Sequence, residues 1–96
     1  MSDRNLRLVV QEVLQANETQ SQILANIWEG EVHVGEILSK VRGGDGTLKT
    51  DQLQMRIERI TMYRREVNTL PCNYGGEIVL SHPSAVSISV GDTLNF

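Results

Sequence analysis

The sequence holds two histidines and one cysteine, the side chains best suited to acid–base, nucleophilic or metal chemistry. His33 and His82 lack the spacing of zinc ligands, and no cluster of cysteines or carboxylates completes a site around them. Cys72 has no basic neighbour that would favour the reactive thiolate, and no base or orienting group for it is visible. His33 stands close to Glu31 and could act as a ligand or general base, but a partly exposed structural histidine is the favoured alternative. We therefore expect no catalytic residue, no metal site, no cofactor and no enzymatic activity.

The loop Gly43–Thr47 is a second candidate, because backbone N–H groups ahead of a helix can bind an anion. It reads Gly-Gly-Asp-Gly-Thr, so it lacks the Lys-Ser/Thr pair and the preceding strand of a P-loop. It also offers one carboxylate where a calcium loop needs several. A plain connecting turn is the favoured interpretation.

A third candidate lies in the arginine-rich segment 56–65. Arginine can donate two parallel hydrogen bonds to a phosphate group, so one hypothesis is a pocket for a phosphate-bearing small molecule such as a signalling nucleotide. The alternative is that Arg64 falls on an apolar helix face and pairs with Glu18 or Glu31, since a buried arginine must be paired. The contact residues of the hypothetical pocket are Tyr63, Arg64, Arg65 and Tyr74.

Composition narrows the class of protein. The chain has 96 residues, a formal net charge of −3 and one cysteine. Its length suggests a single domain, 1–96. The nearly balanced charge argues against general nucleic-acid binding, which needs a basic face, and against docking to anionic membranes. No apolar run approaches the ~20 residues of a membrane span, and no signal peptide is visible. We expect a cytoplasmic protein, or a virion component if a phage encodes it.

Residues 3–42 have apolar side chains at alternating spacings of three and four. This spacing predicts a long coiled-coil helix, because it lines up apolar residues along one face. Gly30 and Gly35 each cost ~1 kcal/mol in a helix, so a kink or break there is the alternative. The positions expected at an oligomer interface are Leu6, Val10, Val13, Asn17, Gln20, Leu24 and Ile27.

A Gly-rich loop and cap at 43–50 is expected to join this helix to a second amphipathic helix at 51–70. Two helices joined by a short loop form an antiparallel hairpin. Met55 and Met62 fall on the outer face of the second helix. Because methionine adapts to irregular surfaces, they are candidates for a contact with a partner protein.

The composition changes after Pro71, which ends the second helix. Glu77–Leu80 and Ala85–Val90 read as strands, so residues 71–96 predict a β-hairpin or short meander. The predicted fold class is therefore mainly α with a small C-terminal β segment.

Helix length argues for self-association. At ~1.5 Å per residue the first helix is about 60 Å long and the second about 30 Å, so the second covers only half of the apolar seam. Monomers rarely leave such a face exposed. We predict a homo-oligomer, with a trimer slightly favoured over a dimer and a hexamer still open. Asn17 and Gln20 would fix the register of the seam or mark where it opens to water.

The leading hypothesis for function is a non-enzymatic structural or assembly protein. A coiled-coil helix followed by a short β segment resembles the layout of small viral fibre and tail components. This layout implies a phage or virion accessory, such as a fibre, tail or head–tail component. The alternatives are a small oligomeric module that sequesters a phosphate-bearing ligand and a regulatory protein that binds a host protein.

Overall fold

The structure is all-β, so the prediction of a mainly α fold is wrong. The computed structural model describes residues 5–51, 53–83 and 86–96, and none of these residues is helical. Coiled coil and helical hairpin are therefore both incorrect. The strands are β1 (Arg7–Ala16), β2 (Gln20–Glu29), β3 (Val32–His33), β4 (Ile37–Leu38), β5 (Lys40–Arg42), β6 (Leu48–Thr50), β7 (Met55–Met62), β8 (Arg65–Val67), β9 (Thr69–Leu70), β10 (Gly75–Ser81) and β11 (Thr93–Asn95).

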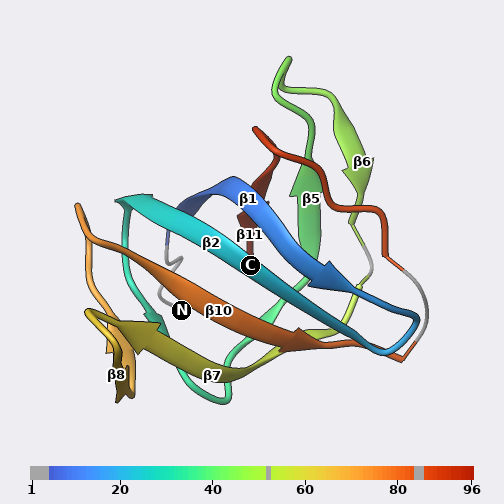
Figure 1. The fold of residues 1–96 in the computed structure, drawn as a ribbon. Helices are drawn as coiled ribbons and strands as arrows, with labels where there is room; N and C mark the ends of the chain where they lie inside the picture. Colours follow the sequence, from blue (N-terminus) through green and yellow to red (C-terminus); the bar gives the residue numbers. More distant parts are fainter. Residues whose placement is uncertain (1–4, 52, 84–85) are drawn as a thin grey trace.

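The main sheet closes on itself into a barrel (Figure 1). Its antiparallel strands follow the order β4-β7-β10-β2-β1-β11-β5, with β6 beyond β5. β4 and β5 are separated only by Ser39, so one nearly continuous segment pairs with β7 on one side and with β11 on the other. The backbone N–H of Ser39 donates to the carbonyl of Asn95 at 3.0 Å and bridges the gap. Closure satisfies the backbone groups that an open sheet leaves at its edges.

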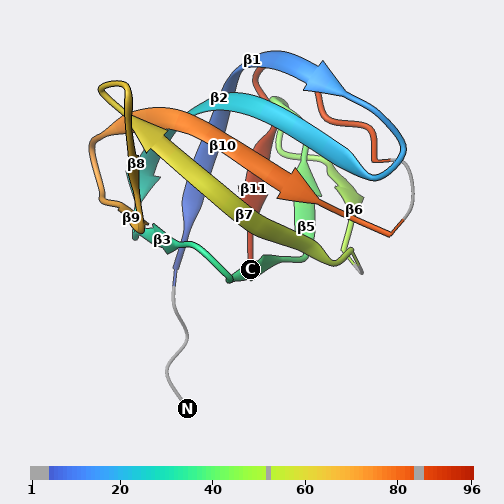
Figure 2. The same cartoon turned by 60° about the horizontal axis from the view of Figure 1, so that its bottom comes forward.

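Four short strands lie outside the barrel wall. β6 extends β5, and β8 pairs with the end of β7. β3 and β9 form a separate two-stranded sheet at the same end of the barrel as β8 (Figure 2). These short strands leave little free edge for pairing with another chain.

The core is filled by alternate residues of the barrel strands, as a period of two requires. In β2, for example, Ile23, Ala25 and Ile27 are buried while their neighbours face outward. The buried cluster consists of Leu6, Leu8, Val10, Ile23, Ala25, Ile27, Val32, Leu38, Val41, Met55, Ile57, Ile60, Leu70, Ile78, Leu80 and Leu94.

The predicted helix over 3–42 is wrong because this stretch contains β1 to β5. A β-bulge in β1 created the misleading pattern. The pairing with β2 shifts between Val10 and Glu12, which leaves Gln11 as an extra residue. A bulge changes the phase of inward and outward side chains. Val10 is buried and Val13 packs against the core, so core residues stand three apart and imitate a helical period.

The predicted helix over 51–70 is wrong for the same reason. This stretch contains β7, β8 and β9, and the pairing of β7 with β10 shifts where Arg59 and Ile57 face consecutive partners. Glu58 is the extra residue of this bulge. Ile57 and Ile60 are both fully buried across it, again three residues apart.

A kink or break of the helix near Gly30 and Gly35 was the alternative to a continuous helix, and no helix is formed there; both glycines lie between strands with positive φ, at 81° and 95°. A Cβ atom on Gly30 would also collide with the carbonyl oxygen of Asn5. The segment 43–50, predicted as a loop and helix cap, is instead the turn between β5 and β6 together with β6 itself.

The C-terminal residues belong to the same barrel and do not form a separate hairpin. The strand expected over Glu77–Leu80 lies within β10, which pairs with both β2 and β7. In the strand expected over Ala85–Val90, Ala85 lies outside the described residues, and 86–90 are not extended strand. The next strand is β11. No helix in the described part of the chain is long and apolar enough to cross a membrane.

Candidate binding surface

One end of the barrel gathers three aromatic side chains that are distant in the sequence. β10 runs antiparallel to both β2 and β7, so β2 and β7 end where β10 begins (Figure 1). Trp28 stands at the end of β2, Tyr63 follows β7 and Tyr74 precedes β10. Their exposed fractions are 61%, 77% and 45%. We define Trp28, Tyr63, Arg64 and Tyr74 as the aromatic end.

Trp28 faces outward because the preceding residue, Ile27, occupies an inward position of β2. The guanidinium carbon of Arg7 lies 5.9 Å from the centroid of the indole ring, within cation–π range. The thiol of Cys72 donates to the carbonyl oxygen of Trp28 over 3.6 Å. The ring is thus positioned by neighbouring groups while most of its area stays open to solvent.

Tyr74 is held at this end by a tight turn. Its N–H donates to the carbonyl of Pro71 at 3.3 Å, and Asn73 takes a positive φ of 71°, which asparagine tolerates well. The turn is joined to β2 by two further bonds. Ile27 N–H donates to the carbonyl of Tyr74 at 3.0 Å, and Asn73 N–H donates to that of Ile27 at 2.8 Å.

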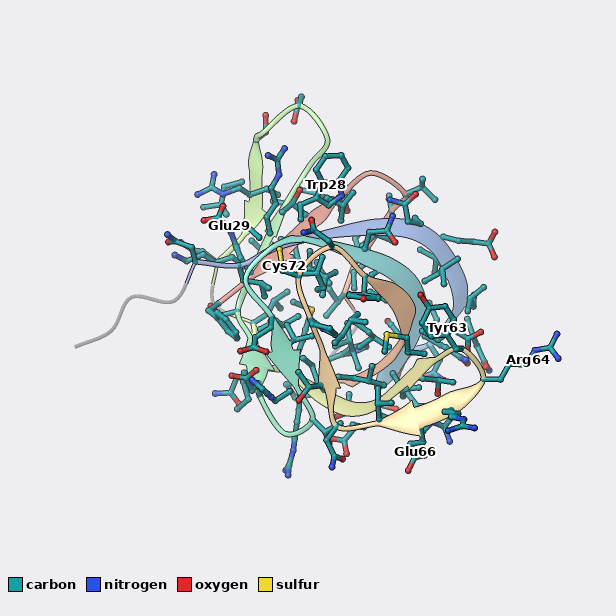
Figure 3. The ribbon with its side chains drawn as sticks, turned by 90° about the vertical axis from the view of Figure 1, so that its left-hand side faces the viewer. Trp28, Glu29, Tyr63, Arg64, Glu66 and Cys72 are labelled. Carbon is teal, nitrogen blue, oxygen red and sulfur yellow. The ribbon has the colours of Figure 1, made fainter. Side chains whose placement is uncertain are left out.

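Tyr63 and Arg64 form the tip of the hairpin between β7 and β8. Met62 pairs directly with Arg65, so the loop has two residues, and both have positive φ, 53° and 64°. This is the geometry of a type I′ turn, which favours Asn-Gly. Left-handed backbone costs roughly 1–2 kcal/mol in a residue with a Cβ atom. Figure 3 shows both side chains at the tip, with Arg64 directed away from the barrel.

Charge at this end is mixed. Arg64 is exposed, so it is not the buried, carboxylate-paired arginine that one interpretation of the sequence required. Arg65 is also exposed, and so are Glu29 and Glu66 (Figure 3). Tyr63 and Arg64 protrude into solvent and do not enclose a ligand. The hypothesis of a phosphate pocket at these residues stays a prediction.

The seven residues expected at an oligomer interface do not share a face. Leu6, Val10 and Ile27 are buried in the core of their own chain, and Val13 packs against it. Leu24 lies on the outer surface of β2. Asn17 and Gln20 belong to the β1–β2 turn, where Asn17 Oδ1 accepts the Gln20 N–H at 2.9 Å. Self-association stays a prediction, but the continuous seam that motivated it is not formed.

The two methionines proposed as a partner surface are placed differently from each other. Met55 is fully buried in the core, and Met62 is half-buried beside it. Met55 therefore offers nothing to a partner.

The histidines make structural contacts. His33 Nδ1 lies 2.8 Å from Thr69 Oγ1, which links β3 to β9, and its Nε2 lies 3.7 Å from Glu31 Oε1. His82 is buried, with Nε2 at 2.9 Å from Ser21 Oγ. Because Ser21 is only 2% exposed, this Ser–His pair has no access to a substrate. In the described residues, no three His, Cys, Asp or Glu side chains are grouped to hold a metal ion.

The loop Gly43–Thr47 is a connecting turn, as its sequence favoured. Asp45 Oδ1 accepts the N–H of Thr47 at 2.9 Å, and Gly43 N–H donates to the carbonyl of Thr47 at 2.8 Å. The bonds from Thr47 lower the pKa of Asp45 below its ordinary value.

Sequence reasoning, which predicted a helix over 3–42, did not single out Trp28 as a surface residue. A period-two reading was available: inward positions at residues 23, 25 and 27 leave 28 facing out. It also missed Arg7, Lys40 and Arg42, whose proximity depends on strand pairing between distant segments.

No protein-family model matches this chain, and no curated protein sequence matches it. Its structure is similar to that of translation elongation factor SelB from Methanococcus maripaludis in the apo form. The TM-score is 0.75 and the identity 15%, over 98% of this chain and 19% of the SelB chain. The chain thus spans about a fifth of the length of SelB. The likeness defines the class of fold: a closed β-barrel of the kind that occurs as one part of that larger factor.

Proposed function

We propose that this chain is a non-enzymatic protein-binding module whose contact surface is the aromatic end. The observation that carries the proposal is the joint exposure of Trp28 and Tyr63, at 61% and 77%, on one end of the barrel. Tryptophan, tyrosine and arginine are the residues most enriched among those that dominate binding energy in protein interfaces.

Backbone strain at the hairpin tip supports the same proposal. Tyr63 and Arg64 occupy left-handed positions where Asn-Gly would be more stable. Such strain clusters at functional sites, because a sequence optimised for stability alone would relieve it. Presenting a large aromatic ring and a guanidinium at a rigid two-residue tip is a gain in binding that offsets the cost.

A protein partner fits this surface better than a nucleic acid. Exposed Glu29 and Glu66 accompany Arg64 and Arg65, so the end lacks the excess of cations that phosphate backbones require. The net charge of −3 points in the same direction. The similar barrel in SelB is about a fifth of a larger factor. We propose that this barrel acts by docking to another protein.

Site-specific photo-cross-linking tests the proposal. A benzophenone amino acid replaces Tyr63 in one variant and Val90, 66% exposed and outside the aromatic end, in a control. After irradiation in lysate of the source cells, the variant at Tyr63 should give a discrete protein adduct that Trp28→Ala abolishes. Equal adducts at both positions, or none at Tyr63, would count against the proposal. An adduct of twice the chain mass would identify a second copy as the partner.

A further inference from the structure

A second surface, on the outer side of β1, β11 and β5, is lined by hydrogen-bond donors. Leu8, Leu94 and Val41 are buried at the centre of these three strands, so the residues flanking each of them face outward. Strand register then places Asn95 opposite Lys40, and Thr93 opposite Arg42. The outward residues are Arg7 and Val9 on β1, Thr93 and Asn95 on β11, and Lys40 and Arg42 on β5.

All of these side chains except Val9 line one hollow of about 910 Å³. Adjacent strands are ~4.8 Å apart, so Arg7 and Lys40, two strands apart, stand about 10 Å from each other across Asn95. Arg42 donates one N–H to the carbonyl of Gly46 at 3.4 Å, and the rest of its guanidinium is unused by the described residues. The side chains of Lys40 and Arg42 are long enough to reach over β11, whereas the guanidinium of Arg7 lies against the indole ring of Trp28.

Asn95 can offer only its amide nitrogen to a ligand in the hollow. Its Oδ1 is buried and has no hydrogen-bond partner within the part of the chain that the structure describes, so this acceptor, which would repel an anion, is out of a ligand's reach. Asn95 makes no side-chain bond to the described residues, so its amide nitrogen lines the hollow with two unused donors. The Asn95 amide nitrogen and the Thr93 hydroxyl therefore provide hydrogen-bond donors on the floor of the hollow. The flanking cations add positive charge.

Two carboxylates also border the hollow and define where an anion would sit. Glu36 Oε1 accepts the backbone N–H of His33 at 2.6 Å, so this carboxylate is engaged by the backbone. Glu29 stands opposite Arg7 on the neighbouring strand β2, away from β5. The most positive part of the hollow is thus the side formed by Lys40 and Arg42.

The geometry points to an anion site in this hollow that takes a phosphate group of a small molecule, held by Lys40, Arg42 and Asn95, with Arg7 closing it from β1. Guanidinium and ammonium groups bind phosphate through charge-assisted hydrogen bonds, and a neutral amide donor adds direction without charge. The site adjoins the aromatic end through Arg7, which also contacts Trp28, but it does not depend on the role proposed for that end.

NMR titration of the whole chain tests the site, with inorganic phosphate, pyrophosphate and ADP as probes at constant ionic strength. The amides of Thr93 and Asn95 and the Asn95 side-chain NH₂ signals should shift in a saturable manner. Lys40→Gln with Arg42→Gln should weaken binding by about tenfold or more, a loss of ~1.4 kcal/mol or more. Arg7→Gln alone should weaken it less, and provides a second test on another strand.

Arg56→Gln with Arg59→Gln is the matched control, because it removes two exposed arginines of β7 outside the hollow. This control should leave the affinity unchanged. Tighter binding of ADP than of pyrophosphate would assign the site to a nucleotide, and equal binding to free polyphosphate. The site is refuted if no probe shifts these signals, or if both double variants weaken binding equally, which would indicate only nonspecific attraction.

Discussion

The two ends of strand β2 differ in which kind of side chain is buried and which is exposed. At its start, Ser21 and His82 are 2% and 5% exposed and bond to each other at 2.9 Å. At its end, Trp28 leaves 61% of its surface in solvent although it is the largest apolar side chain in the strand. At the start of β2 the polar groups are buried and hydrogen-bonded, which stabilises the barrel. At its end an aromatic ring is exposed, which contributes little to stability. The contrast separates residues that hold the fold from residues that are free to bind.

The largest change in the free energy of unfolding should come from substitution of one of two neighbouring residues of β2 that face opposite sides of the sheet. Ile23 is fully buried and Leu24 is 37% exposed. Ile23→Ala should lower the free energy of unfolding by about 2–5 kcal/mol because it leaves a cavity. Leu24→Ala should cost less than about 1 kcal/mol. Urea denaturation of both variants measures the difference. A larger loss of stability for Leu24→Ala would contradict the barrel, because only the coiled-coil helix predicted from the sequence buries Leu24.

The next effect concerns the buried pair at the start of β2. Ser21→Ala removes the buried hydrogen bond to His82 Nε2 and should cost about 1 kcal/mol or somewhat more, the net contribution of such a bond. Ser81→Ala is the matched control, because Ser81 bonds Glu58 at 2.6 Å in an exposed position. It should change the free energy of unfolding by about 0.5 kcal/mol or less. If thermal or chemical denaturation showed similar losses of stability for both variants, burial of the Ser21–His82 hydrogen bond would not be the source of its contribution.

The smallest effect should come from Asp45, which is fully exposed in the β5–β6 turn. The N–H of Thr47 lowers the pKa of this carboxyl in the folded state. Its stabilising contribution is therefore present above the unfolded value, near ~3.9, and is lost as pH falls through the folded pKa. Asp45→Asn should make the acid dependence of unfolding slightly shallower. Denaturation curves at about pH 7 and pH 3 test this, with Asp51→Asn as the control.

Self-association is a separate question, because the sequence argument for it rested on a seam that divides between core and surface. Light scattering on a sizing column measures the solution mass against the chain mass of 10.7 kDa. A stable multiple would mean that copies meet through other residues, such as those of the aromatic end. If copies meet through the aromatic end, the cross-linker at Tyr63 should also give an adduct of twice the chain mass.

The sequence could predict parts of the structure but not its class. It located a strand at Glu77–Leu80 and named Tyr63, Arg64 and Tyr74, which all lie at one end of the barrel. The class was missed because bulges at Gln11 and Glu58 set core residues three apart, a local spacing that strands and helices then share. Strand pairing decides between them, and pairing joins residues that are far apart along the chain.

The donor-lined hollow could not be found from the sequence for a related reason. Arg7, Lys40 and Asn95 come together only because β11 inserts between β1 and β5. Helical and strand periodicities relate residues within one segment only, so they do not predict that β1, β5 and β11 lie side by side. By contrast, an exposed tryptophan could have been inferred once β2 was read with a period of two.

The most direct test of the account replaces the hairpin tip with the residues that its backbone prefers. Tyr63→Asn with Arg64→Gly should raise the free energy of unfolding by about 1–2 kcal/mol, because both left-handed positions become unstrained. The same variant, carrying the photo-cross-linker at Tyr74, should lose the partner adduct that the otherwise unaltered chain gives from that position. Gain of stability with loss of binding is the predicted result. A variant that is no more stable, or that keeps its adduct undiminished, would contradict the claim that this tip is strained for binding.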